Sequence, residues 1–544
     1  MSSMRACKRS AIALLLALSF LLPVGGPARG AESPPVPSLP FERVSPEAKL
    51  VQLSLEECFS LALINNLDIE VGQYIPDINA AGIDVQKGIF DPVAFFNATY
   101  MKDIFPLISS QSVSTGGLSS VELDEWILSG GITGVIPSGM TYNASLTSTH
   151  IPFSTITDAL GTNGEQEFNA SLTFTQPLLK NFGVDVNTTG IRVAAKNTEA
   201  SFYQLQQTVI QTLFSVEQAY WALVGAYENV RVQKDALKLS QDLLDQNRIR
   251  LRVGVIASLD VLQAEVGVAA GEEQVILALY RVLNARDQLI QVINLFPGRV
   301  NWDNVEIMPS DSPSQRPPTE YIEGDQIMTG LRNRPELKQL LIQEEAAELN
   351  AHFTKNQLLP TLNLNATVGL IGLDSDFNSA VLFGVPTSPH TGIDPAWDDL
   401  VSGDNFQWMV GLTFQIPWGN EVARGQYEAA NLQVGQIDTS AQSLRLAIIQ
   451  DVRSALRMID TSWKTVVASK KTTEFRRESL KANQKKYEVG LITAHDLLLF
   501  QNELAAAEDV EIIAVISYNI SLSNLRRATG TLLEFLNVHV TGDP

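Results

Sequence analysis

The chain has 544 residues, of which 45% are hydrophobic and 18% are charged, and its formal net charge is −21. Such an acidic chain has no general attraction for nucleic acid or for an anionic membrane surface, so we expect no nucleic-acid partner. The length allows two to four ordinary domains, or one extended architecture built from repeated units.

The N-terminus has the pattern of an export signal. Basic residues precede an apolar stretch over 11–22, and Ala28-Arg29-Gly30 offers small residues for cleavage near Gly30. We predict a signal peptide over 1–30, followed by a flexible proline-rich segment over 31–46. The one cysteine beyond the signal, Cys58, leaves no intramolecular disulfide, and no metal site is indicated.

Two segments of the chain repeat each other. Asn97-Ala98-Thr99 aligns with Asn365-Ala366-Thr367, and Val253-Gly254-Val255 aligns with Val489-Gly490-Leu491. Several short blocks in the same order indicate an internal duplication. We predict repeats over 47–296 and 319–536, a proline-rich linker over 297–318, and a C-terminal tail over 537–544.

Each repeat is predicted to begin with a helix and to continue into strands, over about 91–178 and about 361–417. There, apolar residues alternate with Thr, Asn and Ser, which suits a strand between lipid and water but equally a soluble hairpin. The first repeat is longer by about 30 residues. Its extra segment, over about 105–165, either adds strands or forms an external cap. We see no apolar run beyond the signal that is long enough for a membrane-spanning helix, so any membrane span would be a β-barrel.

The longest predicted helices carry a coiled-coil pattern. From Val209 to Leu251, apolar residues recur in steps of four and three and then of seven. A sustained period of 3.5 residues is typical of a left-handed coiled coil. We predict long helical hairpins over about 188–294 and about 421–530. They are too polar for lipid and therefore project into water.

Each predicted hairpin turns at a short apolar tip that contains a glycine. The tips are Val253-Gly254-Val255 and Val489-Gly490-Leu491, and glycine can adopt the left-handed conformation that ends a helix. Asp260 and Asp496 lie in the first turn of the returning helices, where an acidic side chain is favourable. An exposed apolar tip is a contact surface or an accident of packing, and we expect a contact surface.

Three further motifs complete a pattern that runs from about residue 53 to about residue 536: Leu53-Ser54-Leu55-Glu56-Glu57, Gln176-Pro177-Leu178 and Leu358-Leu359-Pro360. With the duplication and the tips, they resemble the TolC family of trimeric outer-membrane channel proteins. The resemblance implies a mainly α fold with a β-barrel contribution. Two tandem helix–strand–strand–helix repeats would place long antiparallel coiled-coil helices in a periplasmic tunnel. Each of three protomers would give four strands to one outer-membrane barrel.

The resemblance also implies a function. The protein would be the exit duct of a tripartite efflux or type I secretion system, in the outer membrane of a Gram-negative-type bacterium, with a large periplasmic portion. Its partners would be two further copies of itself, outer-membrane lipid, a periplasmic adaptor protein and an inner-membrane pump or transporter. The sequence leaves open which pump, which adaptor and which substrate.

The family's site residues map onto the two tips. The residues that would contact the adaptor are Val253, Gly254, Val255, Val489, Gly490 and Leu491. In the family an acidic residue of the first hairpin is linked to a tyrosine of the second, and Asp260 and Tyr487 occupy those positions. Asp496 would line the aperture, where a threefold ring of carboxylates attracts cations. Asp260 and Asp496 are equally explained as ordinary first-turn carboxylates.

Two positions depart from the family's gate. Ile492 stands where the family has an arginine, and Leu499 stands where it has a second aspartate. The resemblance therefore implies a thinned polar gate, and leaves open how the aperture is held shut.

Other functions have less support from the sequence. The five histidines have no metal-ligand spacing, and there is no phosphate-binding loop or nucleophile motif, so we expect no enzyme activity, no metal and no cofactor. The alternatives are an exported coiled-coil periplasmic spacer and a porin-like passive pore. A spacer needs no alternating strands, a monomeric porin needs more of them, and neither accounts for the duplicated tips.

Overall fold

The computed structural model describes residues 50–107, 117, 119–154, 165–298, 306–375 and 393–540. The predicted signal peptide (1–30) and proline-rich segment (31–46) lie outside the described residues. So do parts of the linker and of the extra segment, and the last four residues of the tail. Among the described helices, none combines the length and the apolar character that crossing a membrane requires.

Helices form most of the described chain. The α-helices of the first repeat are α2 (Leu55–Asn65), α3 (Leu67–Lys87), α6 (Val184–Asn187), α7 (Thr189–Arg252) and α8 (Ser258–Ile293), with a 3-10 turn at Gly88–Phe90. Those that follow are α9 (Glu323–Asn333), α10 (Pro335–Asn356), α12 (Ile393–Ser402), α13 (Glu421–Glu488), α14 (Ala494–Ala528) and α15 (Leu532–Phe535). Local chemistry sets several boundaries. Ser54 and Glu57 form a capping box that starts α2, and Pro335 occupies the first position of α10.

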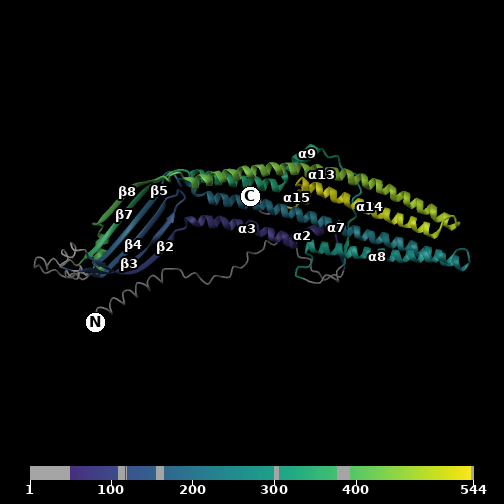
Figure 1. Cartoon of the computed structure of the whole chain (residues 1–544), viewed down its shortest axis with the longest axis horizontal. Coiled ribbons are helices and arrows are strands. Elements are labelled where there is room, and N and C mark those ends of the chain that lie inside the picture. The colour runs from purple at the N-terminus through teal and green to yellow at the C-terminus, as the bar shows by residue number, and fades with distance from the viewer. Residues whose placement is uncertain are drawn as a thin grey trace, which may run out of the picture. The chain divides into compact units, whose positions relative to one another are not determined.

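The two long hairpins are α7 with α8 and α13 with α14 (Figure 1). α7 has 64 residues and α13 has 68. Most heptad residues of α7 are buried, and Leu213, Val216 and Leu223 are fully inaccessible within a core that also includes α2 and α8. Leu251, the last of the series, is exposed. Further apolar clusters join α13 to α14 and, close to the tips, all four long helices. The 3.5-residue period read from the sequence is therefore the packing seam of these helices.

The strands form two sheets. β1 (Leu50–Leu53) pairs in parallel with β6 (Glu306–Pro309), which brings the start of the first repeat to the inter-repeat linker. The second sheet is antiparallel, in the order β2-β3-β4-β5-β7-β8 (Figure 1). Its strands are β2 (Val93–Pro106), β3 (Ser120–Val135), β4 (Thr141–Ser154), β5 (Glu165–Pro177), β7 (Thr361–Ser375) and β8 (Phe406–Gln415). β5 pairs with β7, so one continuous sheet joins the two repeats.

The structure corrects the strand count implied by the resemblance. The fold class is confirmed, with tandem repeats and long hairpins, but the described part of the chain contributes six strands to this sheet rather than four. The additional pair is β3 and β4, which turn at Ser138-Gly139 and pair along nearly their whole length. Much of the extra segment over 105–165 thus adds strands, because its alternating residues continue the pattern of the strands on either side.

Candidate functional site

The two hairpin tips have the same backbone geometry. Gly254 and Gly490 take left-handed φ values of 78° and 77°. The backbone N–H groups donate as follows: Val255 to Arg250 O (3.1 Å), Gly254 to Leu251 O (2.9 Å), Leu491 to Lys486 O (2.9 Å) and Gly490 to Tyr487 O (3.1 Å). This pair of bonds is the Schellman motif, and glycine adopts its left-handed residue without steric strain.

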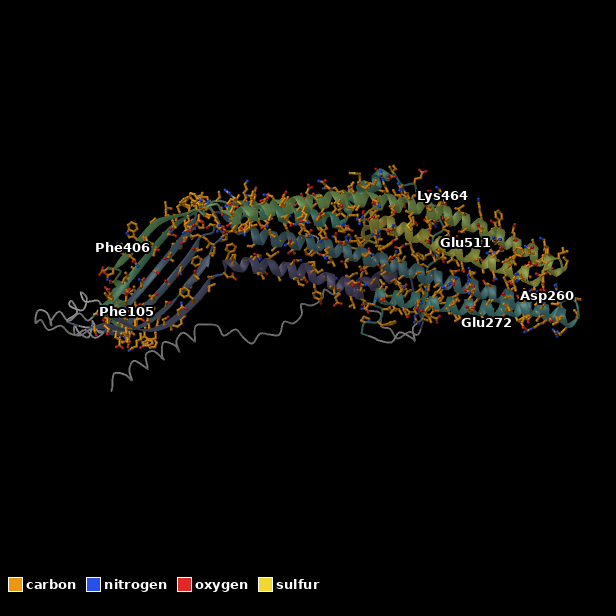
Figure 2. All side chains as sticks on the ribbon, viewed as in Figure 1. Phe105, Asp260, Glu272, Phe406, Lys464 and Glu511 are labelled. Atoms are coloured by element: carbon orange, nitrogen blue, oxygen red, sulfur yellow. The ribbon has the colours of Figure 1, made fainter. Side chains whose placement is uncertain are left out.

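The apolar residues beside these glycines are exposed. Val253 and Val255 are 69% and 68% exposed, and Val489 and Leu491 are 71% and 73% exposed. A side chain placed at either glycine would meet nothing within 4 Å. Asp260 marks the first tip in Figure 2, where Phe105 and Phe406 mark the strands. The chain alone leaves the tips uncovered, and their role as a contact surface stays a prediction.

Asp496 closes a capping box at the start of α14. Its Oδ2 accepts hydrogen bonds from the N–H and the hydroxyl of Thr493 (3.0 and 2.7 Å), and its own N–H donates to Thr493 Oγ1 (3.2 Å). These hydrogen bonds hold the pKa of the Asp496 carboxyl below its ordinary value. The ordinary first-turn role of this carboxylate is therefore present, and its place in a cation-attracting ring stays a prediction.

The link between Asp260 and Tyr487 is indirect. The Tyr487 hydroxyl donates to Oδ1 of Asn247 on α7, and the Asn247 side-chain amide donates to the backbone carbonyl of Asp260 (3.1 Å). The Asp260 carboxylate instead accepts from the N–H of Ala257 (3.3 Å), next to its own helix start. Tyr487 is 5% exposed and Asn247 is inaccessible. A buried asparagine thus joins the two hairpins where the family pattern implied an acid–tyrosine contact.

Arg250 makes a second tie between the hairpins. Its guanidinium donates to the carbonyl oxygens of Tyr487 (3.1 Å) and Glu488 (3.3 Å) and lies 4.7 Å from the centroid of the Tyr487 ring. Both carbonyls belong to the end of α13, where the helix dipole favours a cation. Arg250 therefore joins the end of α7 in the first hairpin to the end of α13 in the second.

Sequence reasoning missed both of these residues. The steps of four and three predict a seam through Leu244, Arg248 and Leu251, so Asn247 lies one residue away from it. The heptad pattern therefore gave no signal for Asn247. Arg250 gave none, because a single arginine near a helix end is common and only the structure shows what it meets.

The two apolar replacements in the gate differ in environment. Ile492 packs against the buried cluster near the tips, which includes Leu497 and Leu498. Leu499 is 51% exposed. Ile492 therefore contributes to the apolar packing of its own chain, whereas Leu499 leaves an apolar side chain at the surface.

Farther from the tips, two carboxyls lie between α7 and α14. Asp509 of α14 accepts hydrogen bonds from the side chains of Asn229 (2.7 Å) and Gln233 (2.8 Å) on α7. Glu217 of α7 accepts one from the hydroxyl of Ser523 on α14. Burial raises the pKa of both carboxyls above their ordinary values.

We expect Glu217→Gln to weaken the pH dependence of the thermal midpoint, Tm. Because the folded-state pKa is raised above 4.5, the stability from this group is full below pH 4.5 and is lost as the pH rises through the folded pKa. The neutral amide cannot ionise, so the Tm of the variant should fall less than that of the parent protein as the pH is raised from 4.5. Asp242→Asn, on an exposed part of α7, is the control and should retain the parent profile. Equal pH profiles for Glu217→Gln and the parent protein would contradict the prediction.

The six-stranded sheet has two chemically distinct faces. The register places Leu172, Val368 and Trp408 on one face and Thr173, Thr367 and Met409 on the other. On the apolar face of β8, side chains are 60–70% exposed: Phe406, Trp408, Val410, Leu412 and Phe414. Such a face is not expected to stand in water, since it forms a contiguous apolar surface.

The opposite face is lined by hydroxyl and amide groups that bond across the strands. The side chain of Thr175 donates to Asn365 (3.0 Å), which donates to Thr413 (2.9 Å). The hydroxyls of Ser145 and Ser171 lie 3.0 Å apart. This face is suited to contact with water.

A family model described as outer membrane efflux protein matches residues 138–295 and 327–531. Outer membrane protein TolC of Escherichia coli K12 is 25% identical over 345 residues, which cover 63% of this chain and 65% of that protein. The chain thus spans slightly less than two thirds of that relative's length. Outer membrane protein TolC of Salmonella enteritidis is 25% identical over 387 residues, which cover 69% of this chain and 72% of that protein.

The fold has solved counterparts. The Campylobacter jejuni CmeC outer membrane channel has a TM-score of 0.61 to this chain at 17% identity, over 88% of this chain and 86% of that one. The family model covers more than half of the chain and includes both long hairpins with their tips. This protein therefore belongs to the outer membrane efflux protein family.

Proposed function

We propose that this chain forms the outer-membrane exit duct of a tripartite efflux or type I secretion system. In this proposal a homotrimer receives substrates from an inner-membrane pump and a periplasmic adaptor and passes them to the outside. Family membership supports the outer-membrane efflux role. The trimer, the partners and the extent of the periplasmic portion are proposed from the features below.

One observation carries the proposal: the two-faced sheet has unpaired edges. Within the described residues, β2 and β8 each pair with a single strand. An unpaired edge presents a row of backbone N–H and C=O groups that needs a partner. Three six-stranded sheets joined edge to edge would close an 18-stranded barrel. Its apolar face would meet lipid and its hydroxyl-lined face a water-filled lumen.

Exposed apolar rows on two helices also favour further copies of the chain. On α8, Leu259, Leu262 and Val266 follow at heptad spacing and are 56–63% exposed. On α3, Val71 and Ile78 lie seven residues apart and are 62% and 68% exposed. A row of exposed apolar residues at this spacing fits a neighbouring helix in a coiled coil. Adjacent protomers would supply that helix and complete the tunnel wall.

We assign the tips to the inner end of the duct. The exposed residues Val253, Val255, Val489 and Leu491 would contact the adaptor, and Gly254 and Gly490 would hold the backbone turn that presents them. Asp260, Tyr487 and Asp496 would border the aperture. Asn247 and Arg250 would hold the two hairpins together there. Their contacts would replace the polar gate contacts that Ile492 and Leu499 cannot make.

The proposal is tested by measuring the mass and the planar-bilayer conductance of the mature protein purified in detergent. A trimer with small, cation-favouring steps would support a nearly closed acidic duct. A trimer with large conductance steps would support the trimeric duct but contradict the idea that the tips alone close it. A monomer without conductance would overturn the proposal in favour of a spacer, and a conducting monomer would favour a porin-like pore.

A further inference from the structure

The short helix α12 covers one end of the apolar face of the sheet. It connects β7 to β8 at the ends of these strands away from α10 and α13. Ala396 and Leu400 of α12 are 0% and 4% exposed and pack against Phe168 of β5, which is 8% exposed. The Trp397 ring meets the Phe168 ring edge to face, with centroids 5.5 Å apart. Phe168 lies four residues before Leu172 on β5 and therefore on the same, apolar face of the sheet. Because α12 packs on Phe168, the helix lies on that face.

Specific contacts hold α12 in this place. A Cβ added at Gly372 would lie 2.1 Å from the carbonyl oxygen of Ala396, so only glycine allows the helix to approach the strand this closely. The carboxylate of Asp399 accepts hydrogen bonds from the N–H of Leu373 (3.0 Å) and from the side-chain amide of Asn405 (2.9 Å). The helix is therefore anchored to both β7 and the start of β8.

α12 carries more apolar surface than the sheet covers. Ile393, Trp397 and Val401 follow at four-residue intervals, lie on one side of the helix, and are 58%, 43% and 66% exposed. Asp394 and Asp398 lie on another side and are exposed. Packing on the sheet uses Ala396, Leu400 and one edge of the Trp397 ring. The rest of the row is left exposed by the chain's own described contacts.

We propose that α12 is an interfacial helix whose row of Ile393, Trp397 and Val401 inserts into the outer lipid leaflet at the rim of the sheet. The inference rests on the proposed function, because it requires the apolar face of the sheet to meet lipid. It goes further, since it assigns a lipid contact to a helix outside the strands. An amphipathic helix with tryptophan on its apolar side and charged groups on the other lies flat at a membrane interface.

The placement of α12 favours lipid as the occupant of this row. The row is continuous with the exposed apolar face, because Leu370, which packs against α12, pairs directly with Phe406 of β8. Phe406 is 67% exposed and Trp408 is 70% exposed on that same face. A water-filled lumen would lie across the sheet, behind the hydroxyl-lined face. A covering segment of this same chain is the competing occupant, and the test separates the two.

The test uses a fluorescent label on single introduced cysteines. Val401→Cys probes the exposed row, Asp398→Cys probes the polar side of the same helix, and Leu412→Cys probes the sheet face itself. The native Cys58 is fully buried and its thiol pKa is raised to about 12, so it stays unlabelled in the folded protein. Labelled protein is reconstituted in phosphatidylcholine vesicles with or without brominated phosphatidylcholine, and iodide serves as the aqueous quencher.

We expect brominated lipid to quench the Val401 label to within about twofold of the Leu412 label, and iodide to quench the Asp398 label. Quenching of the Leu412 label by lipid and of the Val401 label by iodide would overturn the α12 inference and leave the proposed function standing. A Val401 label reached by neither quencher would also overturn it, in favour of cover by another segment. Iodide quenching of the Leu412 label would reject the lipid-facing sheet and the proposed function together.

Discussion

The double substitution Arg250→Ala, Tyr487→Phe is expected to raise the single-channel conductance of the reconstituted protein several-fold. Loss of the Tyr487 hydroxyl leaves the buried Asn247 Oδ1 without its donor, which costs about 1–3 kcal/mol. Loss of Arg250 removes two hydrogen bonds from a cation to the carbonyls that end α13. Together these changes release the second hairpin from the first at the tips. The measurement is conductance in planar bilayers at fixed salt concentration.

Arg248→Ala is the matched control for this prediction. Arg248 lies two residues away on the same helix and pairs with Glu265 of α8 at 3.0 Å, so it joins two helices of the same hairpin. Both partners are about half exposed, and an exposed ion pair contributes little to stability. We expect the control to leave the conductance unchanged. An equal rise in Arg248→Ala would mean that lost positive charge, rather than hairpin release, changes the conductance.

The long helices were predictable because their seam repeats many times. Each of Leu213, Val216 and Leu223 carries little information alone, but a 3.5-residue period sustained over tens of residues admits few other structures. The tips were predictable for a different reason. A glycine between apolar residues, present at corresponding places in both repeats, points to the same helix end twice.

The strand count and the tip contacts were harder to predict. Alternation in the extra segment is compatible with sheet strands or with a separate cap, and only the pairing of β3 with β2 and of β4 with β5 decides between them. The partner of Tyr487 depends on which side chain of the first hairpin lies opposite it. The heptad series places Arg248 rather than Asn247 on the seam of α7, and only the structure shows that Tyr487 meets Asn247.

The place of α12 could not be predicted because few residues make its contact with the sheet. Ala396 and Leu400 alone do not identify a partner surface. Gly372, against which the helix packs, lies in β7. A glycine within a strand has several explanations, so this one did not point to a helix. A contact made by a ten-residue helix with one patch of a sheet leaves no period in the sequence.

Tyr220→Ala is expected to destabilise the chain by about 3–5 kcal/mol, the range for removing a large buried aromatic side chain. The Tyr220 side chain is 0% exposed and lies at the meeting point of α7, β1 and the linker after β6. Its hydroxyl accepts the N–H of Asp311 (3.1 Å), and its single proton can go to Asp311 Oδ2 (3.0 Å) or to the carbonyl of Leu53 (3.2 Å). The substitution removes the ring and these bonds together, and the measurement is chemical denaturation of the purified protein.

Two phenylalanine variants separate the ring from the hydroxyl. Tyr220→Phe keeps the ring and leaves the Asp311 N–H without its acceptor, so it should destabilise the chain by about 1–3 kcal/mol. Tyr227 is partly buried and lies seven residues, about two turns, after Tyr220 on α7. Tyr227→Phe removes one hydrogen bond, to the carbonyl of Ile307 (3.0 Å). It should cost less, about 0.5–1.5 kcal/mol. If Tyr220→Phe costs no more than Tyr227→Phe, the hydroxyl does not hold the junction, and the effect of Tyr220→Ala comes from ring packing alone.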